Sequence, residues 1–244
     1  MKLLLLADGL VGRSIAKYIY DAFPNDIALI VTTNANDIYQ DAVRKKIPVS
    51  IYESEQKIID NLNFLPDIGV LAWWPKIIKE PLLRKPIKGF INTHPSYLPY
   101  NRGKNYNFWS IVEEVPFGVT IHKVEKGIDN GDILFQEKIE YDWEDTGETL
   151  YHKAQSAITK LFCKHYHEIR KGSIKLNPQP KGLGSFHTSS ELSSASKILL
   201  NKNYIARDLL NLLRAKTFEG YPGCWFEDSG DRYEITVKIS KVNR

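Results

Sequence analysis

Fully apolar runs alternate with helical patterns through the first part of this chain, and no other feature limits its fold as strongly. Residues 3–6, 27–31 and 68–72 are such runs, and the segments between them carry apolar residues at helical spacing. Buried strands separated by helices are typical of a parallel sheet that is covered on both faces. The sequence therefore predicts an α/β fold.

The pattern changes after residue 90. Residues 118–124 and 133–139 read as two strands joined by a tight turn that contains residues 129–131, so the predicted sheet is mixed but mostly parallel. Asp145 and Glu148 have capping-box spacing and begin a long predicted helix that ends near Lys171. The other predicted elements are strands 49–52 and 90–93, helices 37–46, 55–61 and 105–113, and a helix after the turn at 9–12 with Ile15, Ala16 and Ile19 on one face.

The last part of the chain predicts a small C-terminal helix and β-hairpin subdomain. Residues 177–185 hold two prolines and two glycines and read as a linker, which is followed by a helix at 204–214. Residues 224–227 and 232–239 flank a turn and form a predicted hairpin. This tail is too short for a core of its own. We therefore expect a catalytic domain at 1–180 and a subdomain at 181–244 that packs on it, on a second subunit, or on both.

Composition limits the class of protein, its partners and the compartment that we expect. The 43% hydrophobic and 25% charged fractions are ordinary for a globular protein, and the formal charge of +4 fits either plain solubility or a small anionic substrate. The lysines are scattered, so we expect no nucleic-acid partner. Cys163 and Cys224 are far apart, which favours reduced thiols over a zinc site. No apolar run has the length of a signal peptide or a membrane span, so we expect a cytoplasmic protein.

Two early segments each allow two interpretations. The turn with Gly9 and Gly12 lies where a dinucleotide fingerprint would be, but the pattern is incomplete, so a tight turn for helix packing is favoured over a nicotinamide site. Trp73 and Trp74 follow the carboxyl end of a buried strand, where ligands bind in open α/β sheets. They could sandwich a flat heterocycle, or they could be core or interface residues.

A polar constellation in the middle of the chain suggests acid–base chemistry. Asn92 and His94 are two residues apart on a strand, so they project to the same side. Histidine accepts protons near neutral pH, and an asparagine amide can donate to a developing oxyanion. The alternative is a structural histidine. Asp129 and Asp132 lie in a glycine-flanked loop, and a carboxylate there could orient His94 and raise its pKa.

At these positions the sequence resembles the folate-dependent formyltransferases. The family pattern Asn-x-His-Pro-Ser-x-Leu-Pro, an Arg-Gly loop, and Gly-x-Asp-x-Gly-Asp-Ile match residues 92–99, 102–103 and 127–133 in order. The resemblance covers roughly residues 1–170 and implies a Rossmann-like formyltransferase fold. It implies that His94 is the general base, Asn92 the oxyanion stabiliser and Asp129 the partner of His94. The implied formyl donor is N10-formyltetrahydrofolate, with no metal. The implied pteridine pocket is lined by Trp73, Trp74, Pro75, Ile128 and Asp132.

The acceptor that the resemblance implies is an amino sugar. The loop at residues 100–109, residues 184–187 and the short hairpin look most similar to sugar N-formyltransferases, which act on dTDP-linked amino-dideoxysugars for surface polysaccharide such as O-antigen. Our best candidate is dTDP-4-amino-4,6-dideoxyglucose. Methionyl-tRNA or glycinamide ribonucleotide enzymes, or a binding module without catalysis, are the alternatives. The residues expected to hold the nucleotide sugar are Lys76, Asn101, Arg102, Lys104, Phe186 and His187.

Two further expectations concern the loop and the tail. Lys104 departs from the small residues usual in the family loop, and it could pair with a pyrophosphate or be solvated. The hairpin from Cys224 to Ile239 has an apolar face that little chain remains to cover, so we expect a homodimer joined through it.

Overall fold

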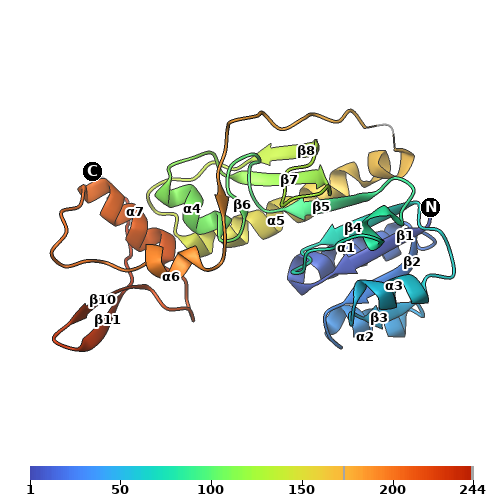
Figure 1. Cartoon of the computed structure of the whole chain (residues 1–244), viewed down its shortest axis with the longest axis horizontal. Helices are drawn as coiled ribbons and strands as arrows, with labels where there is room; N and C mark the ends of the chain where they lie inside the picture. Colours follow the sequence, from blue (N-terminus) through green and yellow to red (C-terminus); the bar gives the residue numbers. More distant parts are fainter. Residues whose placement is uncertain (173, 243–244) are drawn as a thin grey trace. The chain divides into compact units, whose positions relative to one another are not determined.

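A seven-stranded sheet organises the computed structural model, which describes residues 1–172 and 174–242 (Figure 1). The strand order is β3-β2-β1-β4-β5-β7-β8. The first five of these run parallel, and β7 pairs antiparallel with β5. The prediction of a mixed, mostly parallel α/β sheet is therefore confirmed. The strands are β1 (Leu3–Ala7), β2 (Ile27–Thr32), β3 (Val49–Ile51), β4 (Ile68–Ala72), β5 (Phe90–His94), β7 (Gly118–Lys123) and β8 (Ile133–Lys138).

The chain forms two compact units that interleave along the sequence. One unit comprises residues 1–94, 120–136 and 155–179, and the other comprises residues 95–119, 137–154 and 180–244. One junction between them falls between Gln179 and Pro180, and two segments of the predicted catalytic domain, residues 95–119 and 137–154, belong to the second unit.

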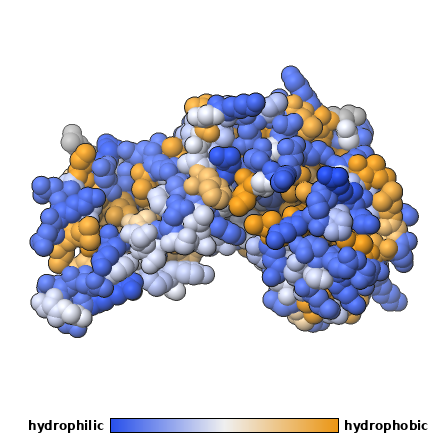
Figure 2. All heavy atoms as spheres, in the orientation of Figure 1, coloured by the Kyte–Doolittle hydropathy of each residue, from blue (hydrophilic) through white to orange (hydrophobic). Residues whose placement is uncertain are grey.

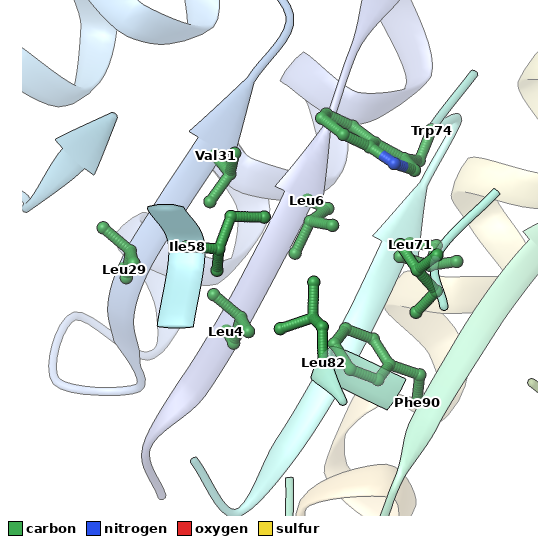
Figure 3. Packing of buried hydrophobic residues seen from close by; sticks show 10 residues of the cluster. Leu4, Leu6, Leu29, Val31, Ile58, Leu71, Trp74, Leu82 and Phe90 are labelled. Atoms are coloured by element: carbon green, nitrogen blue, oxygen red, sulfur yellow. The ribbon is translucent and has the colours of Figure 1, made fainter. Parts of the chain in front are cut away.

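Apolar residues on alternating sides of the strands build the core of the first unit. Leu4 of β1 faces Ile58 of α3 (Glu55–Asn61) and Leu82 of the 3-10 helix η1 (Leu82–Arg84), and Figure 3 shows Phe90 directed toward the same group. Leu3 and Leu5 are also fully buried and point to the opposite side because strand side chains alternate. The helix α1 (Gly9–Ala22) packs against β1, and α2 (Asp37–Arg44) follows β2.

The long helix α5 (Gly147–Lys171) is anchored to the first unit by a buried carboxylate. Asp26 accepts hydrogen bonds from Arg170 Nε at 2.5 Å and Nη2 at 3.0 Å, and from the Tyr166 hydroxyl at 3.0 Å. Burial and the neighbouring Asp26 raise the pKa of Tyr166, so its hydroxyl stays a donor. This contact fixes the last turns of α5 beside the loop that precedes β2.

The second unit contains the shorter helices and both two-stranded sheets. Its helices are α4 (Tyr106–Val112), α6 (Glu191–Ala195) and α7 (Ala206–Lys216), and its strand pairs are β6 (Arg102–Gly103) with β9 (Phe186–His187) and β10 (Cys224–Asp228) with β11 (Asp231–Ile235). A small core of Ile198, Leu213 and Cys224 lies under the hairpin. Ser229 and Gly230 both have positive φ, as a two-residue hairpin turn requires, so the predicted hairpin is confirmed although β11 ends at Ile235.

Three local predictions differ from the structure. The connection between β7 and β8 runs from 124 to 132 and is a loop, not a tight turn, since nine residues separate the two strands. The reciprocal cap at the start of α5 is made by Thr146 and Thr149, whose hydroxyls accept each other's backbone N–H at 2.9 and 3.3 Å. Asp145 instead accepts from Lys153 of the same helix, and Glu148 accepts from the backbone N–H of Glu219, so the predicted capping box between Asp145 and Glu148 is wrong.

The two-residue strands β6 and β9, the 3-10 helix η1 and α6 were not expected from the sequence. β6 and β9 hold only two residues each, and α6 holds five, so their local patterns are too short for a periodic signal. Figure 2 shows that hydrophilic residues cover most of the visible surface, with hydrophobic residues scattered among them.

Candidate active site

The candidate catalytic residues of the first unit come together at the end of β5. His94 is 5% exposed, and its Nδ1 lies 3.5 Å from Asp129 Oδ2. The Asn92 amide donates to Asp129 Oδ1 at 3.3 Å. Asn92 and His94 project to one side of β5 because they are two residues apart, and Asp129 reaches them from the β7–β8 loop. The distances are at the long end of the hydrogen-bond range, so the groups orient one another without a tight contact.

A second histidine joins this cluster, and sequence reasoning gave it no role. His122 of β7 is the cross-strand partner of Asn92, is 2% exposed, and has Nε2 at 3.3 Å from Asn92 Nδ2. Its Nδ1 lies 2.7 Å from the Lys123 carbonyl oxygen. A carbonyl can only accept, so Nδ1 carries the proton and Nε2 of a neutral ring accepts from the amide. The alternation of β7 could have indicated His122, since an antiparallel register opposite Asn92 places the two side chains on one face.

The two tryptophans after β4 have different environments. Trp74 is 9% exposed, belongs to the apolar core, and meets Tyr52 edge-on with ring centroids 5.5 Å apart. Trp73 is half-buried, has a φ of 58°, and lies close enough to Gly9 that a Cβ there would sit 3.2 Å from its ring. The core interpretation therefore describes Trp74, whereas Trp73 is the ring that borders the β1–α1 turn.

The β1–α1 turn itself is organised by Asp8. Its carboxylate accepts from the backbone N–H of Gly9 at 2.8 Å, from Thr33 Oγ1 at 2.5 Å and from Asn36 Nδ2 at 3.2 Å. A Cβ at Gly12 would meet the Ala72 carbonyl oxygen at 2.8 Å, so this glycine allows α1 to pack closely on the sheet. This geometry favours the tight-turn interpretation of the two glycines.

Other predicted residues of the first unit lie around these groups. Pro75 and Lys76 are exposed, and Lys76 Nζ lies 5.1 Å from the centre of the Tyr52 ring. Ile128 is 40% exposed in the loop that carries Asp129, and Asp132 is half-buried at its end. Over residues 1–172 and 174–242, no three His, Cys, Asp or Glu side chains are grouped so that they could hold a metal ion.

In the second unit, the structure brings together the loop after residue 99 and the segment before residue 188. Arg102 pairs with Phe186 and Gly103 with His187 in the parallel β6–β9 ladder. Phe186 is 43% exposed, and the Lys104 side chain is exposed. Basic and aromatic side chains are thus neighbours on one small ladder, as the sequence suggested for a nucleotide site.

Two predicted members of this second cluster are heavily engaged within the protein. Asn101 is fully buried, and its amide is enclosed by Ser110, Ser185 and Glu113. His187 stacks on Trp109 with ring centroids 3.8 Å apart, and its nitrogens face Glu113 at 2.8 Å and Glu191 at 3.0 Å. These contacts hold the backbone of β6 and β9 in place. Arg102, Lys104 and Phe186 are the side chains of the cluster that reach the surface.

Two family models match this chain. The model of a family described as formyl transferase matches residues 22–165, which is more than half of the chain. The chain belongs to the formyl transferase family. A second model, described as the N-formyltransferase dimerization C-terminal domain, matches residues 191–241. The first match contains Asn92, His94, His122 and Asp129, and the second contains α7 and the hairpin.

Individual formyltransferases of the family resemble the chain to different extents. It is 29% identical over 149 residues to a dTDP-4-amino-4,6-dideoxyglucose formyltransferase of Mycobacterium tuberculosis, a match over 61% of this chain and 63% of that protein. A 4-N formyltransferase from Francisella tularensis superposes with a TM-score of 0.82 at 23% identity, over 99% of this chain and 98% of that one.

A further solved structure is more similar in sequence. A formyltransferase from Anoxybacillus kamchatkensis, in complex with UDP-4,6-dideoxy-4-formamido-L-AltNAc and tetrahydrofolate, has a TM-score of 0.58 at 30% identity, over 80% of this chain and 89% of that one. Because the Francisella structure is only 23% identical, its similarity concerns the fold. The match of the formyl transferase model confirms the family resemblance that was stated from the sequence.

Proposed function

We propose that the chain is an N-formyltransferase that moves the formyl group of N10-formyltetrahydrofolate to the amino group of a nucleotide-linked amino sugar. The observation that carries this proposal is the cluster of Asn92, His94 and Asp129 at the end of β5, with contacts of 3.3 and 3.5 Å. Support comes from relatives in the family whose names or bound ligands include amino or formamido sugars and tetrahydrofolate.

The cluster contains the groups that formyl transfer needs. The amine nitrogen of the acceptor attacks the formyl carbon, the bond from that carbon to N10 of the folate breaks, and one proton leaves the amine. His94 would take this proton, with Nδ1 turned to Asp129 and Nε2 as the accepting atom. Asn92 would donate to the formyl oxygen as it gains negative charge. The proton is then returned to the departing folate nitrogen, so the transfer balances.

We further propose that the donor and acceptor lie against the side chains predicted from the sequence. Trp73, Pro75, Ile128 and Asp132 would border the pteridine, with Trp74 supporting them from the core. Arg102 and Lys104 would pair with the pyrophosphate, and Phe186 would offer a face to the base. Our best candidate for the acceptor is dTDP-4-amino-4,6-dideoxyglucose, and the product would enter a surface polysaccharide such as O-antigen.

The test is formyl transfer by the purified protein to a panel of dTDP- and UDP-linked amino sugars, with methionyl-tRNA and glycinamide ribonucleotide as competing acceptors. We expect tetrahydrofolate release and a formylated sugar detected by mass spectrometry. Faster formylation of methionyl-tRNA or glycinamide ribonucleotide would contradict the acceptor class. No transfer to any acceptor would favour a binding module without catalysis.

Variants of the cluster test the assignment of roles. His94→Asn and Asp129→Asn should each lower kcat by about 10²- to 10⁴-fold, which is the range for a positioned base. His152→Asn is the matched control, because its ring is 61% exposed on α5. Unfolding curves should stay close to that of the unchanged protein. Near-normal turnover in both cluster variants would contradict the assigned roles.

A further inference from the structure

A glutamine outside every motif holds the backbone of the loop that carries Asp129. Nε2 of Gln179 donates to the carbonyl oxygen of Asp129 at 2.8 Å and to that of Gly131 at 2.8 Å. A side-chain amide has two N–H groups, so both donors of Gln179 are spent on this loop. The two bonds hold the carbonyl groups of Asp129 and Gly131, the residues before and after Asn130, and so fix the backbone next to the Asp129 carboxylate.

The loop has a conformation that needs such support. Asp129 has a φ of 50°, which costs a residue with a side chain of order 1 kcal/mol or more. Inside the loop, the Asn130 side chain donates to the Lys126 carbonyl at 3.0 Å, which closes the turn but does not tie it to the sheet. The Asp129 carboxylate must stay within 3.5 Å of His94 and His122, so a shift of one ångström would separate them.

The segment that carries Gln179 is rigid and fixed to the sheet. The backbone N–H and carbonyl of Asn177 pair with those of Ile133 at 3.0 and 2.8 Å, which places this segment antiparallel beside the start of β8. Pro178 and Pro180 flank Gln179 and restrict its backbone to extended conformations. The backbone of Gln179 is therefore held in place, so its side chain loses little additional conformational entropy when it binds the loop.

The orientation of the Gln179 amide is set by the same contacts. Oε1 is buried and has no hydrogen-bond partner among residues 1–172 and 174–242. The reverse orientation would turn this oxygen toward two carbonyl oxygens and leave both without a donor. The observed orientation therefore leaves one atom, Oε1, without a hydrogen bond, whereas the two loop carbonyls both have a donor.

We propose that Gln179 is a positioning residue for Asp129, a proposal that rests on the proposed formyl transfer. It acts through the backbone of residues 129–131 and keeps the carboxylate at the distance from which it orients His94. Loss of its two donors lets the loop relax from the left-handed conformation at Asp129, and the base then loses its partner.

The first experiment measures turnover in Gln179→Met, which keeps the volume and removes both donors. We expect kcat to fall by on the order of 10- to 100-fold, the loss that a misplacement of about 1 Å can cause, while KM for the amino sugar changes little. Gln56→Met is the matched control, because Gln56 is exposed on α3 and its side-chain amide donates to Asp60 Oδ1 at 2.8 Å. A kcat equal to that of the control would overturn the proposal.

A double-mutant cycle separates positioning from general stability. If Gln179 acts through Asp129, Gln179→Met should cause no further loss of kcat in a chain that already carries Asp129→Ala. A structural role would instead lower kcat by the same factor with and without the Asp129→Ala change. A double variant whose loss of kcat equals the product of the two single losses would therefore overturn the proposal.

A readout without turnover keeps this proposal separate from the proposed function. The imidazole resonances of His94 should move in Gln179→Met in the same direction as in Asp129→Asn, and they should stay in place in Gln56→Met. Unmoved resonances would overturn the role of Gln179. A protein that formylates no acceptor but shows this pattern would refute the proposed function alone.

Discussion

Two residues of the same type can have different surroundings at this site. His94 and His122 are both buried, and each has a ring nitrogen 3.5 Å from the Asp129 carboxylate, but His122 is also held by the Lys123 carbonyl at 2.7 Å and faces the Asn92 amide. The pair Trp73 and Trp74 separates in the same way, one at the β1–α1 turn and the other in the core. Residue identity alone does not distinguish the members of either pair.

The two cysteines show the same dependence on surroundings and give a prediction. Burial raises the pKa of the Cys163 thiol to about 11 and that of Cys224 to about 12. Because the thiolate is the reactive form, both should react with a disulfide reagent at pH 8 far more slowly than a free cysteine. Release of the chromophore measures this, and both thiols should react at once in denaturant. Rapid labelling of the folded protein would show that one of the thiols is not shielded as described.

At the scale of elements, single buried polar residues join helices to the loops beside them through several hydrogen bonds each. Asp26 holds the end of α5 in the first unit. In the second unit, buried Arg214 of α7 donates to the carbonyl oxygens of Asp142 and Asp145 at 2.5 and 2.9 Å. The Asp145 carboxylate then accepts from the Asp142 backbone N–H at 3.0 Å, so the turn before α5 is closed from both sides.

This turn gives a prediction about stability and pH. Burial opposes ionisation of Asp145, but hydrogen bonds from Lys153, the Asp142 backbone and Thr149 outweigh it and hold the pKa of Asp145 below its usual range. A lowered folded-state pKa stabilises the protein above the unfolded-state value of about 3.9 and loses its effect as pH falls through the folded-state value. Asp145→Asn should therefore lower the free energy of unfolding by about 1–3 kcal/mol at pH 7, and by less below about pH 4.

Urea unfolding at pH 7 and pH 3 measures both parts of this prediction. Asp142→Asn is the control, since its carboxylate is exposed and accepts from the Glu144 backbone N–H at 2.9 Å. A difference between the Asp145 variant and the unchanged protein that is the same at both pH values would argue against an ionised, hydrogen-bonded Asp145.

At the scale of the whole molecule, the C-terminal segment carries apolar side chains that its own small core does not cover. Residues 191–241 match a dimerization domain, and the exposed residues in this range include Leu199, Leu200, Ile205 and Tyr233. A core of three buried residues is small for a segment of this length. We propose that a second copy of the chain covers this surface through the hairpin. No helix within residues 1–172 and 174–242 is long and apolar enough to cross a membrane.

The dimer proposal predicts the behaviour of one hairpin variant. Tyr233 is 46% exposed and stacks on Phe226 at 5.2 Å, so both rings lie on one face of the hairpin. Tyr233→Glu would bury a charge at the interface and should convert dimers to monomers in sedimentation velocity. Glu234→Gln, at the next position along β11, should leave the dimer intact. A chain that sediments as a monomer at every concentration would contradict the proposal.

Much of the fold follows from local pattern in the sequence. Continuous apolar runs such as residues 3–6 and 68–72 indicate strands that are buried on both faces of a sheet. The two-residue spacing of Asn92 and His94 places both side chains on one face of β5. The glycine-flanked loop offered Asp129 and Asp132 as carboxylates for His94, and the family pattern identified Asp129. The apolar runs and the spacing of Asn92 and His94 depend on neighbours in sequence, and for that reason they could be predicted.

Only the tertiary structure decided the features that depend on residues far apart in the chain. Cross-strand register placed His122 opposite Asn92, and the pairing of Asn177 with Ile133 brought Gln179 over the loop of Asp129. Distant partners also bind Glu148 of the predicted capping box, through the Glu219 backbone, and His187, through Glu113. A buried polar group takes the partner that packing brings to it, and packing joins segments whose separation in sequence carries no local signal.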